Sequence, residues 1–165
     1  MASVVSMTTR AVMDLLTADP GVAGNLAAMW KDANQPVAEL VAPRVVAGFA
    51  AAGVFDLAQG GKYPQVIVYC EKVRNAMTEK FNHFSGTVDM VLEVRHSQDR
   101  LEGLEERTQM YCEAVIATLD DARGDWSNGV YFTGEYEVKF EPAKHGGRNF
   151  VQVARVKVPV TVRIN

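Results

Sequence analysis

Apolar and polar residues follow the clearest pattern from residue 63 onward. Residues 65–70 (QVIVYC) are almost continuously apolar, which is typical of a short strand buried on both faces. The two residue types alternate over residues 87–95, so a strand with two different faces is expected there. One face carries Val88, Met90, Leu92 and Val94, and the other carries Asp89, Glu93 and Arg95. Two consecutive strands are therefore predicted.

The spacing of apolar residues then changes and predicts a long helix from Ser97 to about Ala122. Ser97 supplies an N-cap side chain, and apolar residues three or four positions apart form one stripe. The stripe consists of Leu101, Leu104, Thr108, Tyr111, Val115, Ile116 and Leu119. The other side carries Glu102, Glu105, Glu106, Arg107 and Glu113. Gly124 and Asn128-Gly129 end the helix and turn the chain.

Two further alternating segments, residues 130–141 and 150–164, predict a C-terminal pair of strands. Residues 142–149 between them are expected to form a mobile hairpin loop. The polar face of the first strand is acidic and that of the second is basic, so we predict an antiparallel charge ladder. The predicted opposite pairs are Glu137 with Arg155, Glu135 with Lys157, and Val138 with Ala154.

The first 62 residues are predicted to be mainly helical. A first helix begins within residues 6–10 and ends before residues 19–21, because proline cannot continue the hydrogen-bond ladder. Residues 22–33 form a second helix, and residues 36–58 form one or two helical pieces. Gly60-Gly61-Lys62 is a flexible joint before the following strand.

Together these elements predict an α+β protein with a mostly antiparallel four-stranded sheet. The order is strand, strand, helix, strand, strand, with the long helix packed on the sheet and a helical segment at the N-terminus. We expect a single domain over residues 1–165, with a helical part at 1–62 and a sheet-and-helix core at 63–165.

Composition and charge are those of an ordinary globular protein. The chain has 165 residues, 48% of them hydrophobic and 22% charged, and a net charge of −3 that gives no signal for nucleic acid. The start MASVVSMTTR does not resemble a signal peptide, and Pro43 and Arg44 interrupt the longest apolar run. Cys70 and Cys112 are expected to be buried thiols in a reducing cytoplasm, with a disulfide as the alternative.

None of the residue types that usually carry catalysis stands in a catalytic spacing. His83, His96 and His145 form no HxxxH or HExxH motif. Ser97 and Asp99 beside His96 are better explained by helix capping and the helix dipole than by nucleophilic catalysis. The two Gly-Gly pairs that precede a cation lack the rest of a phosphate-binding loop. We therefore predict no catalytic, cofactor-binding or metal-binding residue.

A basic stripe runs along the last strand and the loop before it. It consists of Lys144, Arg148, Arg155, Lys157 and Arg163, with no acidic residue between them. Alone, this stripe would suit contacts with phosphate. The acidic neighbouring strand favours the other interpretation, which is an internal charge ladder of Glu135, Glu137, Arg155 and Lys157.

Residues 63–69 (YPQVIVY) resemble the aromatic-proline-strand signature of lambda-type phage tail terminator proteins. The later segments of the chain are similar to that family in their order: an alternating strand at 87–94, a helix at 101–119 with Tyr111 near its middle, and a closing β-hairpin. The resemblance covers residues 63–165 and, loosely, the first helix. The chain departs from the family in its long apolar segment at residues 17–62.

The resemblance implies a structural virion protein of the tail or neck, assembled in the host cytoplasm, with no enzymatic activity and no cofactor. Such a protein forms a hexameric ring on the finished tail tube, ends tube growth and offers a surface to the head connector or stopper protein. DNA passes through the ring only as cargo. The implied candidates for contact with a neighbouring subunit or partner are Lys144, His145, Arg148 and Asn149. Acidic residues of the helix or strand are implied candidates for the channel wall.

Three other functions remain open from the sequence. The first is a head–tail adaptor or tail completion protein, which differs in partner. The second is a small-molecule-binding or enzymatic α+β domain with its pocket between the sheet and residues 36–58. The third is a nucleic-acid-binding module that uses the basic stripe.

Overall fold

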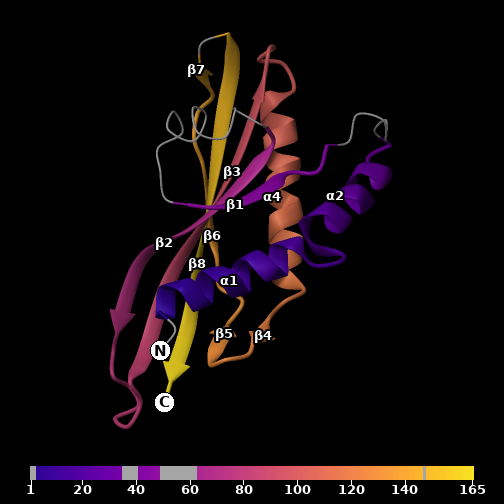
Figure 1. The fold of residues 1–165 in the computed structure, drawn as a ribbon. Helices are drawn as coiled ribbons and strands as arrows, with labels where there is room; N and C mark the ends of the chain where they lie inside the picture. Colours follow the sequence, from indigo (N-terminus) through magenta and orange to yellow (C-terminus); the bar gives the residue numbers. More distant parts are fainter. Residues whose placement is uncertain (1–2, 35–40, 49–62, 147) are drawn as a thin grey trace.

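The computed structural model describes residues 3–34, 41–48, 63–146 and 148–165. The fold is α+β, with helices packed on one face of a curled mixed sheet (Figure 1). The described helices are α1 (Val4–Thr17), α2 (Gly21–Asp32) and α4 (Leu104–Asp120). The strands are β1 (Arg44–Ala47), β2 (Gln65–Asn75), β3 (Phe84–Gln98), β4 (Gly124–Asp125), β5 (Val130–Phe132), β6 (Glu137–Phe140), β7 (Lys144–Gly146) and β8 (Asn149–Ile164).

The sheet is built around two long antiparallel strands, β3 and β8. They stay in register from Phe84 opposite Ile164 to Gln98 opposite Phe150. The full path is β1-β2-β3-β8-β5-β4, with β6 and β7 also paired to β8, and only the β1–β2 pair is parallel. The predicted sheet packed against a helix is confirmed, but four strands is too few, since the main path alone contains six.

One reason for the difference is that residues 130–141 do not form one strand. The chain leaves the ladder after β5 and returns to it at β6. Gly134 lies between the two pieces with φ +99°, a backbone conformation that favours glycine and does not continue a strand. A residue with a side chain there would approach Arg123 within 2.9 Å of its Nε atom.

The same interruption changes the predicted register. In β5, Tyr131 pairs with Thr161, and an unbroken strand would carry this register on to Glu137 opposite Arg155, as predicted. Instead Glu137 lies opposite Lys157, so the predicted pairs are wrong by two residues. Lys139 lies opposite Arg155, Val138 opposite Val156, and Glu135 lies outside β6. Because a two-residue shift preserves the faces, the assignment of polar and apolar sides still holds.

The long helix begins later than its apolar spacing predicts. Strand β3 continues through Ser97 to Gln98, because the beginning of β8 pairs with it there. Ser97 is therefore not an N-cap, and α4 begins after Gly103, whose φ is +78°. The helix is confirmed from Leu104 onward, and Leu101 lies outside it.

The N-terminal part matches the sequence pattern in its first two helices. α1 and α2 are confirmed as helices, although α1 begins at Val4, before its predicted start within residues 6–10, and residues 44–47 form strand β1 instead of a helix. Val45 and Val46 are β-branched and favour the parallel pairing with β2. The other residues of 36–58, except 41–43 and 48, lie outside the described residues, as does Gly60-Gly61-Lys62.

The main hydrophobic core lies between the sheet and the helices. α1 crosses β1, β2 and β3, α4 packs on β3 and β8, and α2 packs on α4. The core face of the sheet includes the predicted stripe Val88, Met90, Leu92 and Val94, each fully buried. The β2–β3 hairpin and the β7–β8 hairpin extend to opposite ends of the molecule (Figure 1). Within the described ranges, no helix has the length and apolar character needed to cross a bilayer.

Candidate functional site

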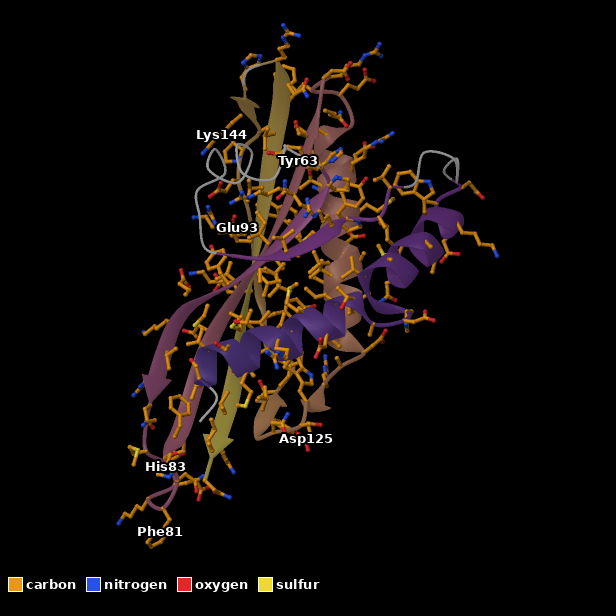
Figure 2. All side chains as sticks on the ribbon, in the orientation of Figure 1. Tyr63, Phe81, His83, Glu93, Asp125 and Lys144 are labelled. Atoms are coloured by element: carbon orange, nitrogen blue, oxygen red, sulfur yellow. The ribbon has the colours of Figure 1, made fainter. Side chains whose placement is uncertain are left out.

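A cluster of charged side chains lies on the sheet face opposite the helices. Glu93 and Arg95 occupy alternate positions of β3, and Arg155 lies opposite Glu93 on β8. Glu93 and Arg95 are each only 4% exposed. Glu93 is labelled near the middle of the sheet in Figure 2. The sequence pattern places these side chains on one polar face, but that face is covered at this point.

Glu93 is the centre of the cluster because three side chains donate hydrogen bonds to its carboxylate. The Tyr69 hydroxyl lies 2.9 Å from Oε1, and Arg155 Nε lies 2.8 Å from the same atom. Arg95 Nε lies 3.0 Å from Oε2. Arg155 also pairs with Glu141, which lies just after β6, so among the described residues the cluster contains two arginines and two glutamates.

The cluster holds its groups in one charge state near neutral pH. Burial would raise the pKa of Glu93, but hydrogen bonds from Arg155 and Arg95 outweigh it and hold this pKa below its usual value. Burial, together with the nearby Glu93, raises the pKa of Tyr69 to about 12. The hydrogen bond to Glu93 raises the pKa of Arg155. Groups with these pKa values suit a structural role better than proton transfer.

The predicted charge ladder exists only in part. Arg155 belongs to the buried cluster, and Lys157 reaches past β3 to Glu71, with 3.2 Å between Nζ and Oε2. Both side chains of that pair are nearly half exposed, so it contributes less than about 1 kcal/mol. Glu137 faces Lys157 across the ladder, and Glu135 is exposed outside the strand. The sequence interpretation missed Tyr69, Glu93 and Glu141 as the partners of Arg155.

The predicted contact residues Lys144, His145, Arg148 and Asn149 lie together in the β7–β8 hairpin and are exposed. Residues 144–146 are a paired strand where the sequence predicts a loop. Lys144 pairs with Val151, and the His145 ring meets the Phe150 ring edge-on, with 5.3 Å between their centroids. Figure 2 shows Lys144 at the end of the sheet away from Phe81. Their role in subunit or partner contact stays a prediction.

Exposed apolar side chains mark both ends of the sheet. At the β2–β3 hairpin, Phe81 is 100% exposed and Met77 is 48% exposed. At the other end, Leu101 is 58% exposed and Phe140 is 43% exposed. The sequence pattern assigns Leu101 to the buried helix stripe, and it gives no signal that Phe81 lies in the turn of a long hairpin.

The residues considered for catalysis do not converge. His96 is buried against Tyr111, with ring centroids 5.1 Å apart, and burial lowers the pKa of His96. Ser97 is the next residue of the same strand and therefore points to the opposite face. Across the described residues, no group of three or more His, Cys, Asp or Glu side chains is arranged to hold a metal ion.

The two cysteines are separate free thiols. Cys70 is half-buried on β2, and Cys112 is fully buried on α4. Burial raises the pKa of Cys112 to about 12, so its thiolate form is disfavoured near neutral pH. The expected burial of thiols is confirmed for Cys112.

An open pocket of about 540 Å³ lies where β3 turns into α4. Its lining is mainly polar and charged and includes Asp99, Arg100, Glu106 and Arg107, with Trp30 at its side. Arg107 lies over the Trp30 ring, 5.9 Å from its centroid. Neither His96 nor Cys112 lines this pocket, so the buried titratable groups of the core do not face it.

No family model matches the chain, and no curated protein matches it either. The geometry and the sequence pattern therefore carry the functional argument.

Proposed function

We propose that this chain is a structural virion protein, a tail terminator that forms a ring at the head-proximal end of a phage tail tube. In this role it ends tube polymerisation and gives the head connector or stopper protein a docking surface. Its partners are further copies of itself, six in the ring, and the tail tube protein. DNA passes through the ring as cargo, and the protein is not an enzyme.

The observation that carries the proposal is the placement of apolar and charged groups. Among the described residues, the arginines of the buried cluster pair with glutamates on the sheet, whereas exposed apolar side chains lie at the two ends of the sheet. Phe81 marks one end, and Leu101 and Phe140 mark the other. The two ends of the sheet thus carry different exposed apolar surfaces. Two different contact surfaces on one subunit suit head-to-tail assembly into a closed ring. The resemblance of residues 63–165 to tail terminators supports the same conclusion.

The β7–β8 hairpin is the second candidate contact. Lys144, His145, Arg148 and Asn149 are exposed there, and the hairpin projects beyond the helices. A projecting basic hairpin suits docking to an acidic neighbour surface. Replacement of Lys144 and Arg148 by serine is expected to weaken capping of tubes and leave the fold intact.

The test is to mix the purified chain with tail tubes assembled from the tube protein of the phage that encodes it. Electron microscopy should show rings at one end of each tube, and tubes capped in this way should stop growing when tube protein is added. Native mass measurement of the ring should give six copies. A chain that leaves tube length and tube ends unchanged contradicts the proposal.

Two alternatives predict different results in the same experiment. A head–tail adaptor binds the connector and leaves tube growth unaffected. A small-molecule-binding domain is favoured by the pocket of about 540 Å³ at the start of α4, whose arginines and acids would select a polar ligand. It predicts that a ligand raises the melting temperature of the monomer and that Arg107→Ser abolishes this shift.

A further inference from the structure

The β2–β3 hairpin ends in a side chain that has no cover among the described residues. β2 ends at Asn75 and β3 begins at Phe84, and Phe81 lies in the turn between them with 100% exposure. Figure 2 shows Phe81 at the tip, pointing away from the body of the molecule. Lys80 precedes it and is exposed as well. The tip therefore presents an aromatic ring beside a cation.

A groove with complementary properties lies at the other end of the molecule. It has a volume of about 390 Å³ and lies between the start of α4 and the segment just after β6. Leu101, Leu104 and Phe140 give it apolar walls, and Glu105 gives it an acidic side chain. Leu101 and Phe140 are 58% and 43% exposed, so part of the apolar wall faces solvent.

A buried acceptor in this groove indicates that something donates to it. Gln152 lines the groove and is only 5% exposed. Its Nε2 donates to the carbonyl of Glu141 at 3.1 Å, but its Oε1 has no hydrogen-bond partner within the described part of the chain. Buried acceptors are nearly always paired, so an occupant that brings a donor is favoured here. The groove thus suits an apolar group that carries a neighbouring N–H donor.

The hairpin tip of the same chain does not reach this groove. β3 has 15 residues and connects the tip, before Phe84, to the groove, after Gln98. At about 3.3 Å per residue, the strand separates the two sites by roughly 45–50 Å. A tip that occupies a groove must therefore come from another copy.

We infer that the β2–β3 hairpin tip of one copy docks into this groove of a second copy. Phe81 packs against Leu101 and Phe140, and Lys80 lies beside Glu105. The two surfaces differ, so the contact is heterologous and repeats from copy to copy until a ring closes. The inference names the contact that holds together the ring of the proposed function, and it rests on that proposal.

Cysteine cross-linking of the full chain tests the contact directly. In a Cys70→Ser background, a chain with both Lys80→Cys and Glu105→Cys keeps the apolar side chains of the contact and should form a disulfide-linked ladder under mild oxidation, at protein concentrations where the wild type associates. Each single variant has no cysteine on the facing surface, so it should give no ladder and at most a dimer between two like cysteines. A matched control with Tyr131→Cys in place of Lys80→Cys places the cysteine at another exposed site, 49% exposed on β5, and should give no ladder. A double variant that gives no ladder overturns the inference.

Charge reversal distinguishes this specific contact from nonspecific hydrophobic association. Lys80→Glu and Glu105→Lys should each weaken self-association at least tenfold, and the chain with both changes should recover most of it. Lys31→Glu, at an exposed site on α2, is the matched control and should leave association unchanged. Unaltered far-ultraviolet circular dichroism shows that each variant folds. Equal weakening by the single and the combined changes, without recovery, contradicts the contact.

The outcome for this contact is distinguishable from the outcome for the proposed function. If wild-type rings cap tubes and Phe81→Ser rings cap them equally well, the tip contact is wrong and the terminator role stands. If association depends on Phe81 but tubes are never capped, the contact stands and the terminator role is wrong. If Lys80→Cys cross-links only to the tube protein, the occupant is not a second copy and the inference is overturned.

Discussion

Replacement of Glu93 by glutamine tests whether the buried charge cluster holds the sheet together. Glu93 is 4% exposed and accepts hydrogen bonds from Tyr69, Arg95 and Arg155. Glutamine keeps the shape but removes the negative charge, so the guanidinium of Arg95, also 4% exposed, loses its ion pair with Glu93. Loss of one partner of a buried ion pair costs about 3–5 kcal/mol. For a chain of this size, that lowers the melting temperature by roughly 6–20 °C.

The assay is urea unfolding followed by circular dichroism, which gives the free energy of unfolding for wild type and variant. Glu71→Gln is the matched control, because Glu71 is 44% exposed in its pair with Lys157. That surface pair contributes less than about 1 kcal/mol, so the control should unfold almost as the wild type does. A Glu93→Gln chain that stays within about 1 kcal/mol of wild type would refute the reasoning.

The pH dependence of this difference is a second readout. The pKa of Glu93 is lowered in the folded chain by its arginine partners, relative to about 4.3 in the unfolded chain. Its contribution to stability is therefore complete above about pH 4.3 and is lost as pH falls through the lower folded pKa. The gap between wild type and Glu93→Gln should be constant near neutral pH and narrow in acid. A gap that stays constant into acid would show that the ionised carboxylate is not its source.

The structure predicts three further outcomes. Gly129→Ala should destabilise the chain by at least about 2 kcal/mol more than Gly103→Ala in urea unfolding. Both glycines have positive φ, but a Cβ at Gly129 would lie 1.9 Å from a backbone carbonyl oxygen of β8, whereas at Gly103 no described atom lies within 4 Å. Ellman's reagent should label Cys70 in the native chain and Cys112 only after unfolding, since Cys112 is fully buried and its pKa is raised to about 12. Because burial lowers the pKa of His96 below its unfolded value of about 6.5, stability should fall as pH decreases from 6.5, and His96→Gln should flatten that part of the profile.

Sequence periodicity predicts which residues share a face better than it predicts where elements end. The alternation in β3 and β8 gives both faces correctly, and the spacing of apolar residues three or four positions apart finds the body of α4. The predicted helix start at Ser97 is wrong because β3 continues as far as its partner strand β8 extends. The length of β8 sets this boundary, and the local sequence around Ser97 does not show it. The predicted register of β6 is wrong because Gly134 interrupts the strand, and the pairing with β8 then shifts by two residues.

The local sequence pattern does not predict that the charge cluster is buried. Alternation shows that Glu93 and Arg95 share a side of β3, but it does not show whether that side is covered. The side is covered, so an apparently solvated face becomes a cluster that fixes Arg155 as well. Leu101 and Phe140 show the opposite case, because their apolar side chains are left partly open where elements end.

The charge cluster lies within the long β3–β8 ladder and helps to set the register of the two strands. Glu93 lies opposite Arg155 within the β3–β8 ladder, between the Phe84–Ile164 and Gln98–Phe150 pairs that close it. A slip of one residue would place Arg155 on the apolar face among the core valines, and a slip of two residues would move it away from Glu93, so the cluster favours the observed register. That register fixes which residues of β8 lie beside the groove near Leu101, Gln152 among them. Weakening the cluster should therefore change ring assembly even where the chain still folds, since the wall of the groove depends on this register.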